Sequence, residues 1–365
     1  MIPIYQPYLP KGSLKRAHSA LDSTWISSKG EYLDEAKDML KDLVGSKYCI
    51  LVNNGTSATH LLSIALNKRS YKENTIVPDG VYVAAWNAMI YDRSNCIVPV
   101  TTDLETWNFD IDQVNQFAKK YDANVLVVHN IGNIVDVTEI DALTVEDNCE
   151  GFLGSYGQMS GTLSLASSTS FFGNKSLTTG EGGAVFTDDE EMFEFLNSTK
   201  GQGQSHIRYL HDKLGYNYRM TNVQAAILIG QLELVDQIIS MKEEIFEQYD
   251  RELDGVIIRP KIHPRTDPSN WMYAVRIPGI SEDDRIKIEH YMYQNYIETR
   301  SMFFDIGSHE YLKDFIRYDD EYDSGPAKLL RNEVLMLPSY PELTKNKVSL
   351  ICNSLKDAIL RVKNK

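Results

Sequence analysis

Short apolar segments alternate with segments of helical periodicity over residues 34–240, and this rhythm constrains the fold more than any other feature. Between the apolar segments, residues are apolar at every third or fourth position, as in Glu35–Val44 and Ala58–Leu66, which is typical of helices. Strands that alternate with helices predict a mostly parallel sheet covered by helices on both faces. The predicted strands are Tyr48–Val52, Asn74–Pro78, Cys96–Val100, Asn124–Val128, Leu143–Asp147, Ser167–Phe172 and Ala184–Thr187.

The sequence changes in texture after the long helical pattern Asn222–Ile239, which is rich in Ala and Leu. Beyond it, the strand-like segments Val256–Arg259 and Met272–Ile277 mix with acidic helical patterns. We therefore expect two domains. Residues 1–250 would form a large domain that includes the N-terminal segment, and residues 251–365 a smaller α+β domain.

Charge and hydropathy argue against two classes of partner. The 365 residues contain 37 Lys and Arg against 51 Asp and Glu, a formal net charge of −14. Because nucleic acids are bound through basic surfaces, we expect no nucleic-acid partner. No segment approaches the roughly 18 apolar residues of a membrane span, so we expect no membrane partner. The four cysteines form no CxxC pair and the N-terminus shows no secretory pattern, which predicts a cytoplasmic protein with reduced thiols.

Three chemically distinctive groups follow predicted strands, where ligands of α/β sheets bind. Gly55-Thr56-Ser57 opens a helix, and amide groups and hydroxyls there suit a phosphate. Asp147 ends a later strand and can face a ligand. Lys175 lies between a strand and a glycine-rich turn, where a desolvated amine can form a Schiff base. Taken singly, each group has an ordinary alternative: an N-cap turn, a capped turn or a solvated loop lysine.

Taken together, the three groups match what pyridoxal phosphate (PLP) requires. The cofactor needs a cradle for its phosphate, an acid beside its ring nitrogen and an amine for its aldehyde. A carboxylate next to the pyridine nitrogen keeps that nitrogen protonated, and the protonated ring accepts electrons. The combination therefore predicts a PLP site, and it is more specific than any of its parts.

Further motifs connect the chain with a known family: Asn54-Gly55-Thr56, Val77-Pro78, Val145-Glu146-Asp147, Ser170–Gly183 and Gly215–Met220. With them the sequence resembles the DegT/DnrJ/EryC1/StrS sugar aminotransferases. The resemblance implies an α/β fold, the aspartate-aminotransferase-like fold type I of PLP-dependent transferases, with a large mostly parallel-sheet domain and a smaller C-terminal α+β domain. The segments Pro3–Tyr8 and Ser23–Glu31 look most like the perosamine-synthase branch of nucleotide-sugar 4-aminotransferases.

The resemblance also implies roles for single residues. Lys175 would bond the cofactor aldehyde and, once released, act as the catalytic base, while Asp147 would pair with the ring nitrogen. Tyr82 would stack on the ring, although a core aromatic is the alternative. Asn217 would reach the cofactor of a neighbouring subunit, which implies a homodimer with shared active sites. The other cofactor-binding residues are expected to be Gly55, Thr56, Ser57, Glu150 and Ser170.

Three residues are weaker candidates for substrate binding. Tyr8 lies in the N-terminal motif of the perosamine-synthase branch. Lys29 would contact a phosphate of the substrate, with an ordinary salt bridge as the alternative. His309 would face the sugar nucleotide, with surface packing as the alternative. No metal site is expected, because His60, His129, His206, His211 and His309 lack the spacing of metal ligands.

The sequence departs from the family pattern at a few places. Glu150 stands where many relatives carry Gln near the phenolic oxygen of the cofactor, so its carboxyl would be protonated, turned away or in contact with another group. Val81 replaces a frequent Thr, which removes one polar contact. The helix that usually follows Val128–Asn133 is expected to be short, because Ile140 stands close to the next strand.

The resemblance implies an enzyme that transfers an amino group from L-glutamate to C-4 of a dTDP- or GDP-linked 4-keto-6-deoxy hexose. The product would be a 4-amino-4,6-dideoxy sugar nucleotide for glycan biosynthesis. Because the 3-dehydratases of the family carry His in place of Lys175, transamination is favoured over dehydration. The open alternatives are a 3-aminotransferase on a 3-keto sugar, an amino-acid aminotransferase and a non-catalytic regulator that binds cofactor or sugar nucleotide.

Overall fold

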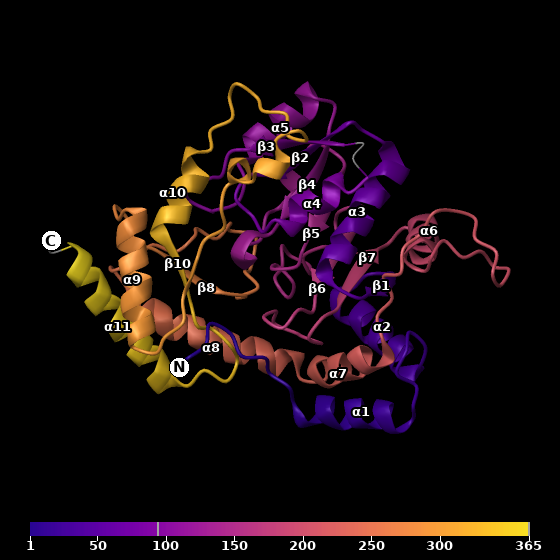
Figure 1. The fold of residues 1–365 in the computed structure, drawn as a ribbon, viewed down its shortest axis with the longest axis horizontal. Helices are drawn as coiled ribbons and strands as arrows, with labels where there is room; N and C mark the ends of the chain where they lie inside the picture. The colour runs from indigo at the N-terminus through magenta and orange to yellow at the C-terminus, as the bar shows by residue number, and fades with distance from the viewer. Residues whose placement is uncertain (93–94, 364–365) are drawn as a thin grey trace.

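A seven-stranded sheet forms the centre of the computed structural model, which describes residues 1–92 and 95–363 (Figure 1). The strand order is β1-β7-β6-β5-β4-β2-β3, and only β7 runs antiparallel to its neighbours. The predicted, mostly parallel sheet is therefore confirmed. Its strands are β1 (Tyr48–Val52), β2 (Asn74–Pro78), β3 (Cys96–Val100), β4 (Asn124–Val128), β5 (Thr144–Asp147), β6 (Ser167–Ser170) and β7 (Gly183–Thr187).

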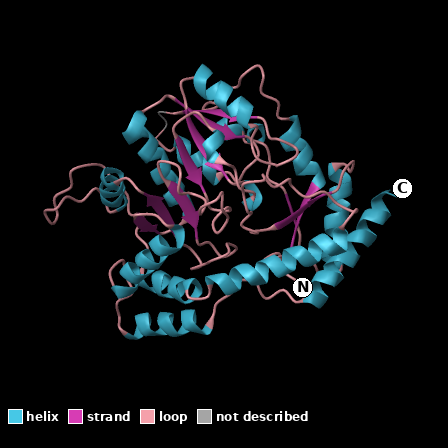
Figure 2. Ribbon diagram, turned by 180° about the vertical axis from the view of Figure 1, so that it is seen from behind, coloured by secondary structure: helices cyan, strands magenta, loops and turns pink. Residues whose placement is uncertain are grey.

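Most strands are rich in apolar residues because both faces of the sheet are covered, and even the polar strand β6 is buried along its whole length. Alternate residues of β1 enter different clusters: Ile50 and Val52 pack with α3 and α4, whereas Cys49 and Leu51 pack with α2 and α7. Figure 2 shows helices on both sides of this sheet. The helices of this part are α1 (Lys11–Asp22), α2 (Glu31–Val44), α3 (Gly55–Ser70), α4 (Ala84–Ile90), α5 (Ile111–Lys120), α6 (Glu190–Lys200) and α7 (Asn222–Leu232).

A smaller antiparallel sheet follows, with the order β8-β10-β9. It packs with the long helices α8 and α11 around a second hydrophobic cluster, which includes Tyr249 and Leu355. The elements are α8 (Val235–Leu253), β8 (Tyr273–Arg276), α9 (Glu282–Gln294), β9 (Arg300–Ser301), η3 (Ile306–Ser308), η4 (Glu310–Leu312), α10 (Gly325–Glu333), β10 (Val334–Leu337) and α11 (Lys345–Lys363).

Two predicted elements are wrong. The pattern Asn222–Ile239 is not one helix, because the chain bends by 66° between α7 and α8, where Leu234 leaves helical geometry. The segment Val256–Arg259 makes only the bridge between Ile258 and Arg276. Pro260 follows it directly and lacks an N–H group, which limits further pairing.

The segment between β4 and β5 has no long helix, which confirms the prediction of a shortened helix there. It contains the 3₁₀ turns η1 (Asn130–Gly132) and η2 (Val137–Glu139) instead of a longer helix. The domain boundary at residue 250 stays a prediction, since α8 crosses it and Ile2 pairs with Ile297 beside the second sheet. Within the described ranges no single helix is both long and apolar enough to cross a membrane, whereas the bent α7–α8 pair meets that test by length and composition alone.

Candidate functional site

The turn between β1 and α3 forms one wall of a cavity. The side chain of Asn54 caps α3 by accepting the Ser57 N–H at 2.8 Å. At Gly55, an added Cβ would lie 2.6 Å from the Cβ of Ser170, so only glycine lets the helix start approach the end of β6 this closely. First-turn amides have no acceptor within their helix. Together with the hydroxyls of Thr56 and Ser170, they suit an anion such as a phosphate.

Asp147 ends β5 and is 7% exposed. Its Oδ1 accepts the N–H of Cys149 at 3.1 Å, and its Oδ2 lies 3.3 Å from the hydroxyl of Thr59 on α3. Thr59 also contacts Ser168 at 3.0 Å on the neighbouring strand. These contacts fix the carboxylate at the carboxyl edge of the sheet, where it lines the cavity.

Lys175 lies in the loop after β6 and is held through its backbone. Its N–H donates to Phe172 O at 2.9 Å, and its carbonyl accepts the hydroxyl of Tyr5 at 2.9 Å. The Nζ lies 4.0 Å from the ring centroid of Trp271, within the range of a cation–π contact. The lysine that the sequence singled out is therefore an ordered, largely covered side chain, and the alternative of a solvated loop lysine is wrong.

Glu150 points into the same cavity. Its Oε2 accepts the N–H of Ile131 at 2.8 Å, and its Oε1 lies 3.9 Å from the Nζ of Lys175. Burial raises the pKa of Glu150 to about 7, and the nearby Lys175 acts against this rise. The carboxyl is thus in contact with other groups, and its burial favours the protonated form.

The contact with Glu150 depends on an unusual backbone conformation. Ile131 has φ 55°, in the left-handed region that β-branched residues rarely enter. Such a conformation costs about 1–3 kcal/mol and persists only where surrounding structure enforces it. Gly132 follows, with its Cα so close to Ser269 that an added Cβ would lie 2.3 Å from the Ser269 hydroxyl. The strained turn aims the Ile131 N–H at the carboxyl group.

The cavity has a volume of about 380 Å³ and brings together most of the predicted cofactor residues. They are Gly55, Thr56, Tyr82, Asp147, Glu150, Ser170 and Lys175. Several other residues line the cavity although the sequence did not mark them as candidates, namely Asn54, Thr59, Phe172, Asn174, Trp271, Arg300 and Phe303. Helical spacing from Gly55 could have indicated Thr59, whereas Trp271 and Arg300 come from distant segments that carry no local motif.

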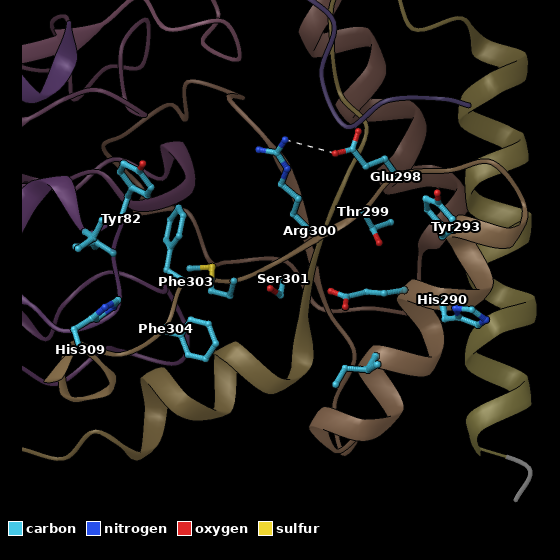
Figure 3. Close-up of a pocket in the computed structure, with 15 residues that line it drawn as sticks. Tyr82, His290, Tyr293, Glu298, Thr299, Arg300, Ser301, Phe303, Phe304 and His309 are labelled. Atoms are coloured by element: carbon cyan, nitrogen blue, oxygen red, sulfur yellow. Dashed lines mark ion pairs between the residues drawn. The ribbon is translucent and has the colours of Figure 1, made fainter.

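A second cavity of about 710 Å³ adjoins the first, and both share Tyr82, Arg300, Ser301 and Phe303. Figure 3 shows Tyr82 and His309 on one side and His290 and Tyr293 of α9 on the other. Tyr82 is 60% exposed, so the alternative of a core aromatic is wrong.

Four predicted residues lie outside these cavities, and their roles stay predictions. Ser57 is buried behind the helix start, and Tyr8 packs against a hydrophobic cluster of α2 and α7. Asn217 is exposed and accepts a hydrogen bond from Arg219 at 3.1 Å. Lys29 lines a separate, cation-rich cavity of about 700 Å³ with Arg219.

One group of side chains in the described part of the chain has the spacing of metal ligands. Asp136, Glu139 and His263 each place a ligand atom within 4.8 Å of the others. Arg265 already pairs with both carboxylates, at 2.9 and 2.7 Å. The arrangement is therefore explained as an ion-pair network, and the expectation of no metal site stays a prediction.

The chain is similar to several known proteins. A GDP-perosamine synthase from Escherichia coli O157:H7 is 35% identical to the chain, over 98% of each protein. One from Vibrio cholerae is 31% identical, over 98% of this chain and 99% of its own length. A Streptococcus pneumoniae putative sugar aminotransferase in its PLP form has a TM-score of 0.90 at 21% identity, covering 99% of both chains. A GDP-4-keto-6-deoxymannose-3-dehydratase with bound GDP-perosamine gives 0.89 at 22% identity, covering 97% of this chain and 100% of that one.

These neighbours have the expected α/β fold, so the prediction of an aspartate-aminotransferase-like fold type I is confirmed. Residues 8–356 match the family described as the DegT/DnrJ/EryC1/StrS aminotransferase family. The chain therefore belongs to the DegT/DnrJ/EryC1/StrS aminotransferase family.

Proposed function

We propose that the chain is a PLP-dependent aminotransferase that moves the amino group of L-glutamate to C-4 of a GDP-linked 4-keto-6-deoxy hexose. The observation that carries the proposal is the single cavity in which Asp147, Lys175 and the start of α3 meet. The full-length relatives named GDP-perosamine synthases favour GDP over dTDP and C-4 over C-3. A non-catalytic regulator is disfavoured because both the amine and the acid are present in the cavity.

The residues of the cavity fit the cofactor. Gly55 provides a cradle that any Cβ would fill, Asp147 offers a fixed carboxylate, and Lys175 offers an amine within the same space. When bound, PLP supplies a ring that accepts the electron pair left when a carbon–hydrogen bond breaks. The carboxylate of Asp147 would hold a proton on the ring nitrogen and so maintain this capacity.

Lys175 would perform two tasks at its Nζ. The amine would hold the cofactor through its aldehyde, and as a free amine it would move a proton between two carbon atoms. The backbone contacts to Phe172 and Tyr5 keep the loop in place while the side chain moves. Trp271 and Glu150 cover the amine and exclude water from it.

The adjoining cavity would bind the sugar nucleotide. Its aromatic side chains Tyr82, Phe303 and His309 offer faces for a sugar or a base, and Arg300 offers a cation where the two cavities meet. Glutamate and the keto sugar would then react one after the other, and the amine of Lys175 would move the proton in both cases.

We also propose a cytoplasmic homodimer with shared active sites. Asn217 and Lys29 lie outside the cavity of their own chain. An exposed amide and a cation-rich cavity are suited to contact the cofactor or substrate phosphates of a second subunit. Sedimentation analysis of the purified protein would test the dimer, and N217A should weaken cofactor binding only if the subunits share their sites.

The reaction is tested by incubating the protein with ¹⁵N-labelled L-glutamate and 4-keto-6-deoxy hexoses linked to GDP or dTDP. NMR of the products should show ¹⁵N at C-4 of the GDP-linked sugar, together with 2-oxoglutarate. The variant K175A is the control and should give no product. Label at C-3, or turnover by K175A, would contradict the proposal.

A further inference from the structure

Lys242 is a buried cation without an acidic partner. It lies on α8, is 2% exposed, and its Nζ donates to the carbonyl of Trp271 at 2.7 Å and to that of Ser339. In the portion of the chain that the structure describes, no carboxylate pairs with it, and only desolvation acts on its pKa. Burying an ammonium group in this way is expensive, and an apolar side chain of similar length would avoid the cost. A specific role is therefore expected for the amino group at this position.

The two carbonyl groups that Lys242 binds belong to neighbouring strands. Trp271 stands just before β8, and Ser339 follows β10. These strands pair with each other, and the Ser339 hydroxyl accepts the N–H of Tyr273 at 3.1 Å. The Nζ of Lys242 also lies 5.4 Å from the ring centroid of Tyr5 in the N-terminal segment. One amine thus joins three segments that are far apart in the sequence.

Residues of two of these segments also contact Lys175 or its neighbour Asn174. Trp271 donates its Nε1–H to the carbonyl of Asn174 at 2.9 Å, and its ring centroid lies 4.0 Å from the Nζ of Lys175. Tyr5 donates its hydroxyl to the carbonyl of Lys175 at 2.9 Å. The backbone and the amine of Lys175 are therefore both contacted by residues that Lys242 holds.

We propose that Lys242 is a positioning residue for Lys175, acting through Trp271 and Tyr5. The inference rests on the proposed function, since it assigns Lys242 to the reaction of Lys175. Burial lowers the pKa of Lys242 to about 7. Because even the neutral amine keeps two N–H donors, it can serve both carbonyl groups in either state of protonation. A misplacement of Lys175 of even 1 Å would slow the reaction about a hundredfold.

The test replaces Lys242 by methionine, which has a similar length and no donor. The control is K72M, because Lys72 is a partly covered lysine, 29% exposed, that pairs with Asp122 at 2.6 Å and lies outside both cavities. The readouts are the pH midpoint of the visible absorbance band of the PLP-loaded protein and kcat and KM for glutamate. K242M should shift the midpoint by about half a pH unit or more and lower kcat about tenfold at similar KM. K72M should leave the midpoint unchanged.

A wild-type midpoint and kcat in K242M, or the same shift in K72M, would overturn the inference. If K242M does not fold, Y5F and W271F are measured instead. Y5F removes the hydrogen bond to the carbonyl of Lys175, and W271F removes the one to the carbonyl of Asn174. Unchanged midpoints in both variants would equally overturn the inference. A wild-type protein without any visible band would instead refute the proposed function, so the two failures can be told apart.

Discussion

Glu150→Gln should make the stability of the cofactor-free protein less sensitive to alkaline pH. Glutamine keeps an oxygen that can accept the Ile131 N–H, which now binds Oε2 at 2.8 Å. It removes the ionisable carboxyl group, whose pKa is raised by burial from 4.5 to about 7. The change therefore isolates the cost of charging this one carboxyl group.

The sign of the effect follows from the direction of the pKa change. A carboxyl whose folded pKa lies above its unfolded value contributes stability below the unfolded pKa, and this contribution is lost as pH rises through the folded pKa. The rise of the Glu150 pKa from 4.5 to about 7 corresponds to a free energy of about 3 kcal/mol, at ~1.4 kcal/mol per pH unit. Between pH 5 and 8.5, the free energy of unfolding of E150Q should therefore rise by about 2–3 kcal/mol relative to wild type.

Urea unfolding of both cofactor-free proteins at the two pH values, followed by circular dichroism, measures this difference. The control is E310Q, because Glu310 is 85% exposed and pairs with Lys313 on the surface. Its effect should stay below about 0.5 kcal/mol at both pH values. If the difference between E150Q and wild type were the same at pH 5 and 8.5, the assignment of a buried group titrating near neutral pH would be refuted.

Two other substitutions test the cofactor site. Gly55→Ala should weaken PLP binding at least about tenfold in equilibrium dialysis, because the new Cβ would lie 2.6 Å from the Cβ of Ser170, and wild-type affinity would contradict the phosphate cradle. Asp147→Asn should retain PLP but slow the half-reaction with glutamate on the order of a hundredfold in stopped-flow absorbance, since a neutral amide does not keep the ring nitrogen protonated; an unchanged rate would refute the role of this acid.

The parts of the fold that depend on local pattern were predictable. Strands such as Asn124–Val128 are apolar on both faces and bounded by turns, so their type and position follow from the sequence alone. The break between α7 and α8 was missed because the apolar pattern continues through Leu234, and only tertiary packing decides that the chain bends there. The segment at Ile258 has strand propensity but meets the sheet edge at a single residue pair.

In the site, too, residues in local motifs were predictable from the sequence, and residues brought in by tertiary packing were not. Gly55, Asp147 and Lys175 each stand at a recognisable place between a strand and a helix or turn. Trp271 contacts Asn174, which lies 97 residues before it, and Lys242 contacts Trp271, which lies 29 residues after it, so no local signal marks either residue. The state of Glu150 could not be derived from sequence either, because it depends on burial and on the strained turn at Ile131.

Lys175 is the amine that we propose bonds the cofactor. Borohydride reduction of the PLP-loaded protein fixes the cofactor to the amine that carries it, and peptide mass mapping then locates the added mass. The label should reside on the peptide containing Lys175, and glutamate added beforehand should prevent the labelling. A label on any other lysine, or none at all, would refute this role of Lys175.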